Sequence, residues 1–369
     1  MLTAYIGSYA PNGGGIHGVH IEAGSPPLLA GEAWIADGDS PSWLTVNAAG
    51  THLYAVHELH RAPGNAEGRG EGRLSSYDLS SGRPRLLGRT GSGGVRPVHL
   101  GLHPEGRHAF VAHYDSGDVC VLAIDDDGCL GPVLDRRALA DACGPQARPG
   151  AAQAEQAPPG SFACSGHEAS HAHMALPAPG GRFVLCTDLG LDRLVVFRFD
   201  AGRGRLLEPR VMPTSPGAGP RHLVFHPQNP SRVYLLSEEA STLAWLRFDD
   251  GALQPLGETS SLPAGFAGTA YASDLRCSPD GHHLYALNRL HDSIAHFSLA
   301  PDGTPTLRDT HWCRGSYPRT LALLPGGRGL VVCNQRSDHL AWFALDGDGV
   351  PRFTGRWTGV GGAASVVFG

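Results

Sequence analysis

Short apolar stretches alternate with polar or Gly/Pro-containing turns along almost the whole chain. The clearest example is residues 220–249, where PRHLVFHP, RVYLLSE and STLAWLRFD follow one another with only a few residues between them. Valine, leucine, phenylalanine and tyrosine dominate these stretches, and apolar runs of this length bounded by turn residues predict β-strands. The unit is therefore a strand, a Pro- or Gly-containing turn, a second strand, a tight polar turn and a third strand.

This three-strand unit repeats along the chain. Copies begin near Pro41, Pro97, Ala172, Pro220, Ser273 and Pro318. Most spacings lie from the mid-forties to the mid-fifties of residues, and the longer spacing between the second and third copies contains an insertion. That period is typical of the four-stranded blades of a β-propeller.

The two ends of the chain resemble the halves of a further copy. Residues 363–368 match an innermost strand, whereas residues 5–9 and 15–21 match the second and third strands. A solenoid of the same repeat would instead need atypical polar units at its ends. We therefore predict an all-β fold, a single seven-bladed β-propeller domain over residues 1–369, closed by pairing of the C-terminal strand with the N-terminal strands.

Composition agrees with this fold and narrows the choice of partners. The chain has 51 glycines and 29 prolines among 369 residues, and only 17% of its residues are charged. The formal net charge of -6 offers no broad basic surface, so neither nucleic acid nor a membrane is an expected partner. No apolar run approaches the roughly 20 residues that span a bilayer. We expect a monomer or weak dimer.

The eight cysteines and the start of the chain bear on location. No cysteine pair has Cys-x-x-Cys spacing, and several cysteines lie in apolar runs, which predicts buried free thiols in a reducing compartment. The chain passes from Met1 directly into a strand-like segment, without the basic and apolar pattern of a signal peptide. We therefore expect a cytoplasmic protein.

Polar residues concentrate at two positions of the repeat. In a propeller blade the innermost strand begins, and the second strand ends, on the same face of the ring. Aligning the copies places these residues at the start of the innermost strand: Ser42, Val98, His173, Arg221, Ser273 and Arg319. The aligned residues at the end of the second strand are Tyr9, Glu58, Tyr114, Asp188, Glu238, Arg289 and Gln335.

Three adjacent copies bring ionisable side chains to this predicted channel mouth. They contribute His173, Asp188, Arg221, Glu238 and Arg289. Arginines hold carboxylate or phosphate groups, and a nearby histidine or glutamate can move a proton, so this mixture suits acid/base chemistry on an anionic substrate. Two expected loops, residues 60–72 and 141–166, join strands at the same face.

Several motifs carry a resemblance over essentially the whole chain. They are Tyr5-Ile6-Gly7-Ser8-Tyr9, His171-Ala172-His173, Asp188-Leu189-Gly190-Leu191-Asp192-Arg193, Gly219-Pro220-Arg221-His222, Asn288-Arg289 with His291-Asp292-Ser293-Ile294, and Tyr317-Pro318-Arg319. With these motifs the sequence resembles the seven-bladed β-propeller lactonase family. That family includes bacterial 6-phosphogluconolactonase and the fungal carboxy-cis,cis-muconate lactonizing enzyme.

The resemblance implies an activity and a site. The implied reaction is hydrolysis of a sugar lactone, with 6-phosphogluconolactone as the substrate that gives the family its name. The implied catalytic residues fall on His173, Arg221, Glu238 and Arg289. We also expect four neighbouring side chains to bind the substrate: His171, Asp188, Arg319 and His222. The family's strand-end Asn-Glu motif is replaced by Ser237-Glu238-Glu239, so either glutamate is a candidate for the channel-facing carboxylate.

Alternatives remain open for each part of this interpretation. The ligand is expected to be a sugar lactone, with or without a phosphate, or another carboxylate, and no cofactor is expected. The same cluster could serve a muconate cycloisomerase, and a propeller can also be a non-catalytic scaffold. His167, His171 and His173 could form a metal triad by count, but no acidic or cysteine partner has suitable spacing, so we expect no metal.

Structural roles are the competing explanation for two groups of these residues. Arg221 and Arg289 could be ion-paired ties between blades, and Asp188 could simply shape a tight turn.

Overall fold

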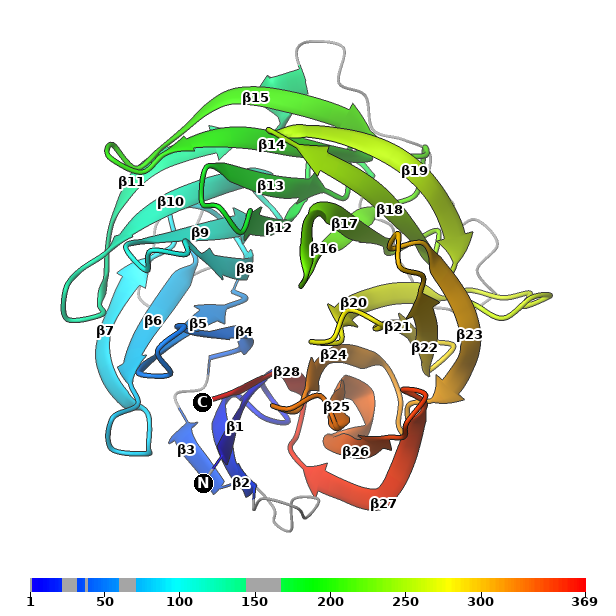
Figure 1. The fold of residues 1–369 in the computed structure, drawn as a ribbon. Helices are drawn as coiled ribbons and strands as arrows, with labels where there is room; N and C mark the ends of the chain where they lie inside the picture. The colour runs from blue at the N-terminus through cyan, green and yellow to red at the C-terminus, as the bar shows by residue number, and fades with distance from the viewer. Residues whose placement is uncertain (1, 22–31, 37–38, 60–70, 144–166) are drawn as a thin grey trace.

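The described residues form a ring of β-sheets. The computed structural model describes residues 2–21, 32–36, 39–59, 71–143 and 167–369. These residues form seven four-stranded antiparallel sheets around a common axis (Figure 1). The predicted seven-bladed propeller is therefore confirmed. We number blade 1 as β28-β1-β2-β3 and blades 2–7 as the following groups of four consecutive strands.

Each blade runs from an inner strand at the axis to an outer strand at the rim. The inner strands are β4 (Pro41–Val46), β8 (Pro97–Leu102), β12 (Ala172–Pro177), β16 (Pro220–His226), β20 (Tyr271–Cys277), β24 (Pro318–Leu323) and β28 (Ala363–Phe368). The second strands are β1 (Leu2–Ser8), β5 (His52–His57), β9 (His108–His113), β13 (Phe183–Asp188), β17 (Asn229–Ser237), β21 (His283–Arg289) and β25 (Gly329–Asn334).

The outer half of each blade is built in the same way. The third strands are β2 (Gly15–Ile21), β6 (Arg73–Asp78), β10 (Asp118–Ile124), β14 (Arg193–Asp200), β18 (Thr242–Asp249), β22 (Ser293–Leu299) and β26 (His339–Leu345). The outer strands are β3 (Glu32–Ala36), β7 (Arg85–Gly91), β11 (Leu130–Ala138), β15 (Arg205–Pro213), β19 (Ala252–Ser260), β23 (Pro305–Trp312) and β27 (Pro351–Gly359). Two 3-10 turns, η1 (Ala140–Cys143) and η3 (Gln335–Ser337), join strands.

The ring closes within blade 1. The last strand, β28, pairs antiparallel with β1, so that Val366 lies opposite Ile6 and Phe368 opposite Ala4. The two ends of the chain consequently lie close together in Figure 1. The inner edge of β1 is thereby covered by β28, as the split-blade pattern of the sequence predicts.

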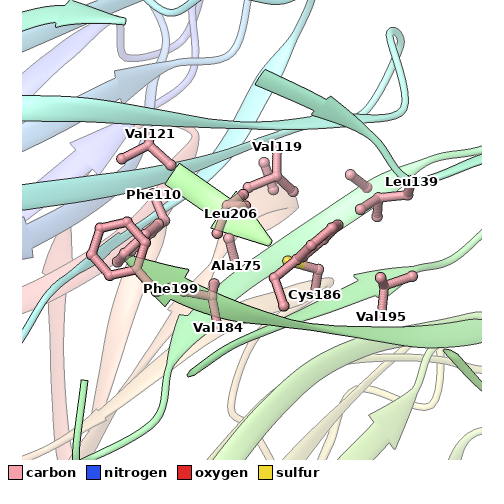
Figure 2. Close-up of a cluster of buried hydrophobic side chains, with 13 residues drawn as sticks. Phe110, Val119, Val121, Leu139, Ala175, Val184, Cys186, Val195, Phe199 and Leu206 are labelled. Atoms are coloured by element: carbon pink, nitrogen blue, oxygen red, sulfur yellow. The ribbon is translucent and has the colours of Figure 1, made fainter. Parts of the chain in front are cut away.

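The core consists of apolar layers between neighbouring blades. Within β9, Phe110 and Ala112 contact blade 4, whereas Ala109 and Val111 contact blade 2. Figure 2 shows the layer between blades 3 and 4, in which Phe110 and Val121 meet residues of β13 to β15. One such cluster of buried side chains occupies each of the seven junctions. Because both faces of a blade are buried near the axis, its second strand is largely apolar, whereas the outer strands are mostly exposed.

Polar ties reinforce the junctions on the face away from the predicted site. The ring Nε2 of His103 donates to the carbonyl oxygen of Gly181 in the next blade, at 3.1 Å, and His226 does the same with Gly281. The hydroxyl of Tyr234 likewise donates to the carbonyl of Gly303 at 2.7 Å. Several of the chain's histidines therefore have structural positions.

A β-bulge interrupts the pairing of inner and second strands in every blade. In blade 4, Ala172 pairs with Asp188 and Met174 with Thr187, which leaves His173 without an opposite residue. The bulged residues of the seven blades are Ser42, Val98, His173, Arg221, Ser273 with Asp274, Arg319 and Ala364. Bulges re-aim side chains, and all six residues predicted at the start of the inner strands are among them, with Asp274 and Ala364 in addition. We call the face where the inner strands begin the site face.

Other sequence expectations concern cysteines, membranes and loops. Six cysteines in the described ranges are free thiols: Cys120, Cys129, Cys186, Cys277, Cys313 and Cys333. None of the described helical segments has the length and apolar character needed to cross a bilayer. The expected loops at residues 60–72 and 141–166 fall almost wholly outside the described residues.

The junction layers make a prediction about stability. Leu246 is 1% exposed in the layer between blades 4 and 5, whereas Leu256 on the outer strand of the same blade is 43% exposed. We expect Leu246→Ala to lower the free energy of unfolding by about 2–5 kcal/mol, because it leaves a cavity in a packed layer. Leu256→Ala should change it by no more than about 0.5 kcal/mol. Urea unfolding of both variants measures the difference, and equal losses would contradict the layered core.

Candidate active site

The residues that follow the second strands meet at the site face. The structure corrects the sequence alignment of these residues in blade 4. In blade 5, Pro220 pairs with Ser237, and Glu238 follows. In blade 4, the equivalent pair is Ala172 and Asp188, so Leu189, and not Asp188, corresponds to Glu238. Asp188 was therefore placed one residue out of register.

The Asp188 carboxylate is engaged in shaping a turn. It accepts hydrogen bonds from the Ser170 hydroxyl at 2.7 Å and from the backbone N–H groups of His171 and Leu191 at 2.9 and 3.1 Å. Asp188 is fully buried. The expected contact between Asp188 and substrate is therefore not supported, because the carboxylate is already used by the backbone of its own blade.

The centre of the site face is a glutamate held by two arginines. Arg221 Nε lies 2.7 Å from one carboxylate oxygen of Glu238, and Arg289 Nη2 lies 2.8 Å from the other. Burial alone would raise the pKa of Glu238, but Arg289 and Arg221 outweigh it and hold this pKa below its ordinary range. Glu238 is therefore an anion at neutral pH, and the structure brings these three predicted residues together.

The two arginines differ in how many donors they have left. All three nitrogens of Arg289 are engaged: besides Glu238, they donate to the Tyr271 and Ala272 carbonyls and to the Tyr317 hydroxyl. Arg221 uses Nε for Glu238 and Nη1 for the Ser273 carbonyl and His222. Burial lowers the pKa of Arg221 to about 10, so its guanidinium stays charged at neutral pH.

A second carboxylate with two arginines lies at the same face. Glu58 pairs with Arg96 at 3.1 Å and with Arg319 at 3.0 Å, and the Tyr9 hydroxyl donates to it. Glu58 and Tyr9 belong to the strand-end series, but the sequence did not single them out as site residues. Nη2 of Arg319 binds Glu58, whereas Nε and Nη1 have no hydrogen-bond partner among the described residues.

A third set of side chains precedes the inner strands, and sequence reasoning overlooked most of it. In each blade we compared the residue that lies two positions before the bulged residue. The large side chains at this position are Arg96, His171, Tyr271 and Tyr317. Arg96 and Tyr317 have φ angles of 56° and 59°, which are uncommon for residues with large side chains. An alignment of this position in the sequence would have identified them.

His171 packs against Tyr114. Its ring stacks on Tyr114 with centroids 4.2 Å apart, its Nδ1 donates to the Tyr114 carbonyl at 2.7 Å, and Nε2 contacts Glu168 at 3.2 Å. Arg96 lies over the same tyrosine ring. The structure thus places His171 where it supports Tyr114, and the prediction that it contacts substrate stays untested.

His173 has a buried ring nitrogen without a partner at the site face. It is 6% exposed, and its Nδ1 has no hydrogen-bond partner within the described part of the chain. Burial, and then the charge of Arg221, hold the pKa of His173 well below its ordinary value, so the imidazole is neutral. Its ring lies 5.1 Å from that of His222. Buried polar atoms without a hydrogen-bond partner are uncommon in proteins, and a catalytic role is one of the explanations for them.

The choice between Glu238 and Glu239 follows from their partners. Glu239 contacts His167, with Nε2 to Oε2 at 3.0 Å, and the other ring nitrogen of His167 lies 3.5 Å from Asp192. Glu238 is therefore the carboxylate of the arginine cluster. His167 and His171 each have their own acidic neighbours.

One cluster in the described ranges has the spacing of metal ligands. His113, Asp118 and Cys120 are buried in blade 3 with their ligand atoms within 4.8 Å of one another. Arg136 already pairs with Asp118, and blade 2 has a similar trio of His57, Asp39 and Arg73 without the thiol. This repetition indicates a polar tie within the blade.

The charges of the site face favour an anionic ligand. Four guanidiniums (Arg96, Arg221, Arg289 and Arg319) pair with three carboxylates (Glu58, Glu238 and Asp115), which leaves an excess of one positive charge. Arginine donors are suited to carboxylate and phosphate oxygens. Free donors remain on Arg319 and on Nη2 of Arg221.

Known proteins share this fold and are similar to this chain in sequence. A family model described as a seven-bladed β-propeller lactonase matches residues 3–368. A 6-phosphogluconolactonase of Bacillus subtilis is 28% identical over 303 residues, which cover 80% of this chain and 77% of that protein. A periplasmic gluconolactonase of Pseudomonas aeruginosa superposes with a TM-score of 0.84 at 28% identity, covering 100% of this chain and 99% of the other. A protein from Lactobacillus plantarum gives a TM-score of 0.81 at 26% identity, with 100% and 99% coverage.

These similarities bear on two earlier expectations. The relatives named for an activity open lactones, so the muconate cycloisomerase alternative has no support. One of them is periplasmic, and the cytoplasmic location expected for this chain therefore stays a prediction.

His167 provides a pH-dependent prediction. Burial opposes its charged form, but Glu239 and Asp192 outweigh it and raise the pKa of His167. Such an ion pair stabilises the fold fully below the unfolded-state pKa, about 6.5, and is lost as the pH rises through the folded-state pKa. We therefore expect His167→Gln to lower the melting temperature more at about pH 5.5 than at about pH 8.5.

Thermal unfolding of the wild type and variant across this pH range measures the effect. The exposed His282, changed to Gln, is the control and should show no such trend. A larger loss for His167→Gln at the alkaline end would contradict the ion pair.

Proposed function

Because the chain belongs to the seven-bladed β-propeller lactonase family, we propose that it hydrolyses the ring ester of a gluconolactone-type sugar at the site face. The relatives named gluconolactonase and 6-phosphogluconolactonase support this reaction class. The observation that carries the proposal is a neutral, buried His173 beside arginines that retain free donors. A base and a stabiliser of negative charge are the two functions that ester hydrolysis needs.

His173 is better suited than Glu238 to accept a proton from water. Both oxygens of Glu238 are held by guanidiniums, so neither is free to accept a proton from water. His173 has an imidazole nitrogen without a partner, and the imidazole is neutral at physiological pH. We therefore assign the general base to His173 and the fixing of Arg221 and Arg289 to Glu238.

Arg221 stabilises the negative charge that develops on the carbonyl oxygen. Its Nη2 has no hydrogen-bond partner among the described residues and is the donor available to that oxygen, whereas Nε and Nη1 of Arg319, which also lack partners there, are the donors available to an anionic group of the substrate. Their positions are set before substrate binds, because Glu238 and Glu58 hold the same guanidiniums. Preorganised donors of this kind are usually the largest contribution to acyl-transfer catalysis.

The reaction then proceeds in two steps. Water adds to the lactone carbonyl carbon as its proton passes to His173, and the resulting oxyanion is held by Arg221. Collapse of this intermediate breaks the bond between the carbonyl carbon and the ring oxygen, which takes the proton from the His173 imidazolium. The product is a hydroxy acid, and its ionisation releases one proton per turnover at neutral pH. No covalent nucleophile is needed, because a lactone is already an activated ester.

The excess positive charge favours a substrate with its own anionic group. We infer that a phosphorylated sugar lactone fits the site face better than a neutral one, because it adds charge opposite to that of the arginines. A sugar hydroxyl in place of the phosphate would leave Arg319 without a charged partner beyond Glu58.

The proposed base predicts a particular pH profile. His173→Asn should reduce kcat for glucono-lactone hydrolysis by about 10²–10⁴-fold, the usual contribution of a general base. A base whose pKa is lowered keeps its free form as the pH falls, so wild-type kcat/KM should change less than about twofold between pH 7.5 and 5.5. An imidazole titrating near 6.5 would instead lose about tenfold over this range.

Proton release, corrected for spontaneous hydrolysis, measures these rates. His52→Asn at the opposite face is the control and should retain full activity. If no sugar lactone is opened faster than the background, the protein is a binding scaffold and not an enzyme. A Glu238→Gln variant with unchanged kcat/KM would also favour the scaffold.

The charge of the substrate can be tested at Arg319. We expect Arg319→Gln to raise KM for the 6-phosphorylated lactone by about tenfold or more, because the loss of a charge-assisted contact is typically worth about 1.5–3 kcal/mol. KM for the unphosphorylated lactone should rise much less. Steady-state kinetics with both lactones measure the two effects, and equal increases would show that Arg319 does not recognise the phosphate.

A further inference from the structure

A histidine and an aspartate lie directly behind the Glu238 arginine cluster. His222 follows Arg221 on β16, and Asp274 lies on the neighbouring inner strand β20. Their exposed fractions are 1% and 0%. His222 Nδ1 and Asp274 Oδ1 are 2.9 Å apart, which is hydrogen-bond distance.

The surroundings of Asp274 determine where the His222 proton lies. Besides His222, the carboxylate accepts from Arg276 Nη1 at 2.8 Å and from the backbone N–H of Leu321 at 3.1 Å. Burial raises the pKa of Asp274, whereas Arg276 and the backbone N–H of Leu321 lower it, and three donors around one carboxylate favour its ionised form. Since an anionic Asp274 can only accept hydrogen bonds, Nδ1 of His222 carries the proton.

The other nitrogen of His222 faces Arg221. Nε2 lies 3.2 Å from Arg221 Nη1, and in the Nδ1–H tautomer it presents a lone pair to that donor. A proton on Nε2 would place two N–H groups against each other. Burial and the charge of Arg221 keep the pKa of His222 well below its ordinary value, which agrees with a neutral ring.

We propose that His222 and Asp274 are positioning residues that direct the Arg221 guanidinium toward the lactone carbonyl, an inference that rests on the proposed lactonase function. Asp274 fixes the tautomer of His222, and His222 in turn accepts from Nη1 of Arg221. Glu238 holds Nε from the other side. With these two nitrogens fixed, Nη2 is the donor that remains for the substrate.

Asparagine and glutamine at position 222 separate the two contacts of the ring. The amide nitrogen of Asn can replace Nδ1 as donor to Asp274, but Asn is too short to reach Arg221. The carbonyl of Gln extends to the position of Nε2 and can accept from Arg221. We expect His222→Asn to lower kcat by about tenfold or more with little change in KM, and His222→Gln to lose less than about threefold.

His99 offers a matched control. It occupies the corresponding position of β8, is 2% exposed, and its Nδ1 contacts the Ala175 N–H at 3.4 Å and no arginine. His99→Asn and His99→Gln should therefore have similar kinetics. The melting temperatures of these two variants and of the two variants at position 222 show whether a kinetic loss comes from weaker packing or from a misdirected Arg221 guanidinium. Equal losses for Asn and Gln at position 222, or unchanged kcat in His222→Asn, would overturn the proposal.

A measurement without substrate keeps the proposal distinct from the proposed function. In ¹⁵N-histidine-labelled protein, with His222→Gln used for assignment, His222 should show a protonated Nδ1 and an unprotonated Nε2 from about pH 5 to 8. Asp274→Asn should change this tautomer or mix the two. A cationic ring or a protonated Nε2 in the wild type would overturn the positioning role even if lactonase activity is found. A correct tautomer without lactone hydrolysis would overturn the function in which the positioning acts.

Discussion

Every blade of this protein is apolar on both faces, and this one constraint organises the rest of the structure. A sheet that is apolar on both sides is stable only when a neighbour covers each side, so seven such sheets must form a closed ring. The pairing of β28 with β1 provides the closure, and the layer between blades 1 and 7 joins residues such as Ile6 and Trp342 that are far apart in sequence. Opening the ring would expose that layer to water.

The same constraint determines where chemistry can occur. Strand interiors are occupied by the junction layers, so ionisable side chains are tolerated mainly where strands end. The bulge at the start of each inner strand then turns one side chain out of the regular alternation, and in blades 4 and 5 those side chains are His173 and Arg221. The proposed site is thus assembled from single residues of several blades, and no continuous segment of the chain contains it.

Sequence periodicity was enough to predict the blades and the residues at the start of the inner strands, because each copy contains the same strand and turn pattern. It was not enough for the ends of the second strands in blade 4, where Asp188 was aligned with Glu238. The misalignment arose because both are acidic residues next to a turn, and only the backbone register shows that Asp188 pairs with Ala172.

The sequence also could not predict which side chains pair with one another. Glu238 and Glu239 are adjacent and chemically identical, yet one pairs with two arginines and the other with His167. Arg96 and Tyr317 were overlooked because the repeat was aligned from the first residue of each inner strand, and these residues come just before it. Their left-handed backbone conformation turns them toward Glu58 and Arg289.

Two carboxylates, each shared by two arginines, are difficult to explain by stability alone. Replacing a buried ion pair with apolar residues is often neutral or stabilising, because desolvation of the charges offsets their attraction. Glu58 and Glu238 do, however, hold four guanidiniums in fixed directions while leaving an excess of positive charge. A fixed guanidinium does not need to reorganise when an oxyanion forms. This lowers the free energy of the transition state and does not contribute to the free energy of folding. The buried glutamates are therefore better understood as supports for the arginines than as contributions to folding, which is also why we assign proton transfer to His173.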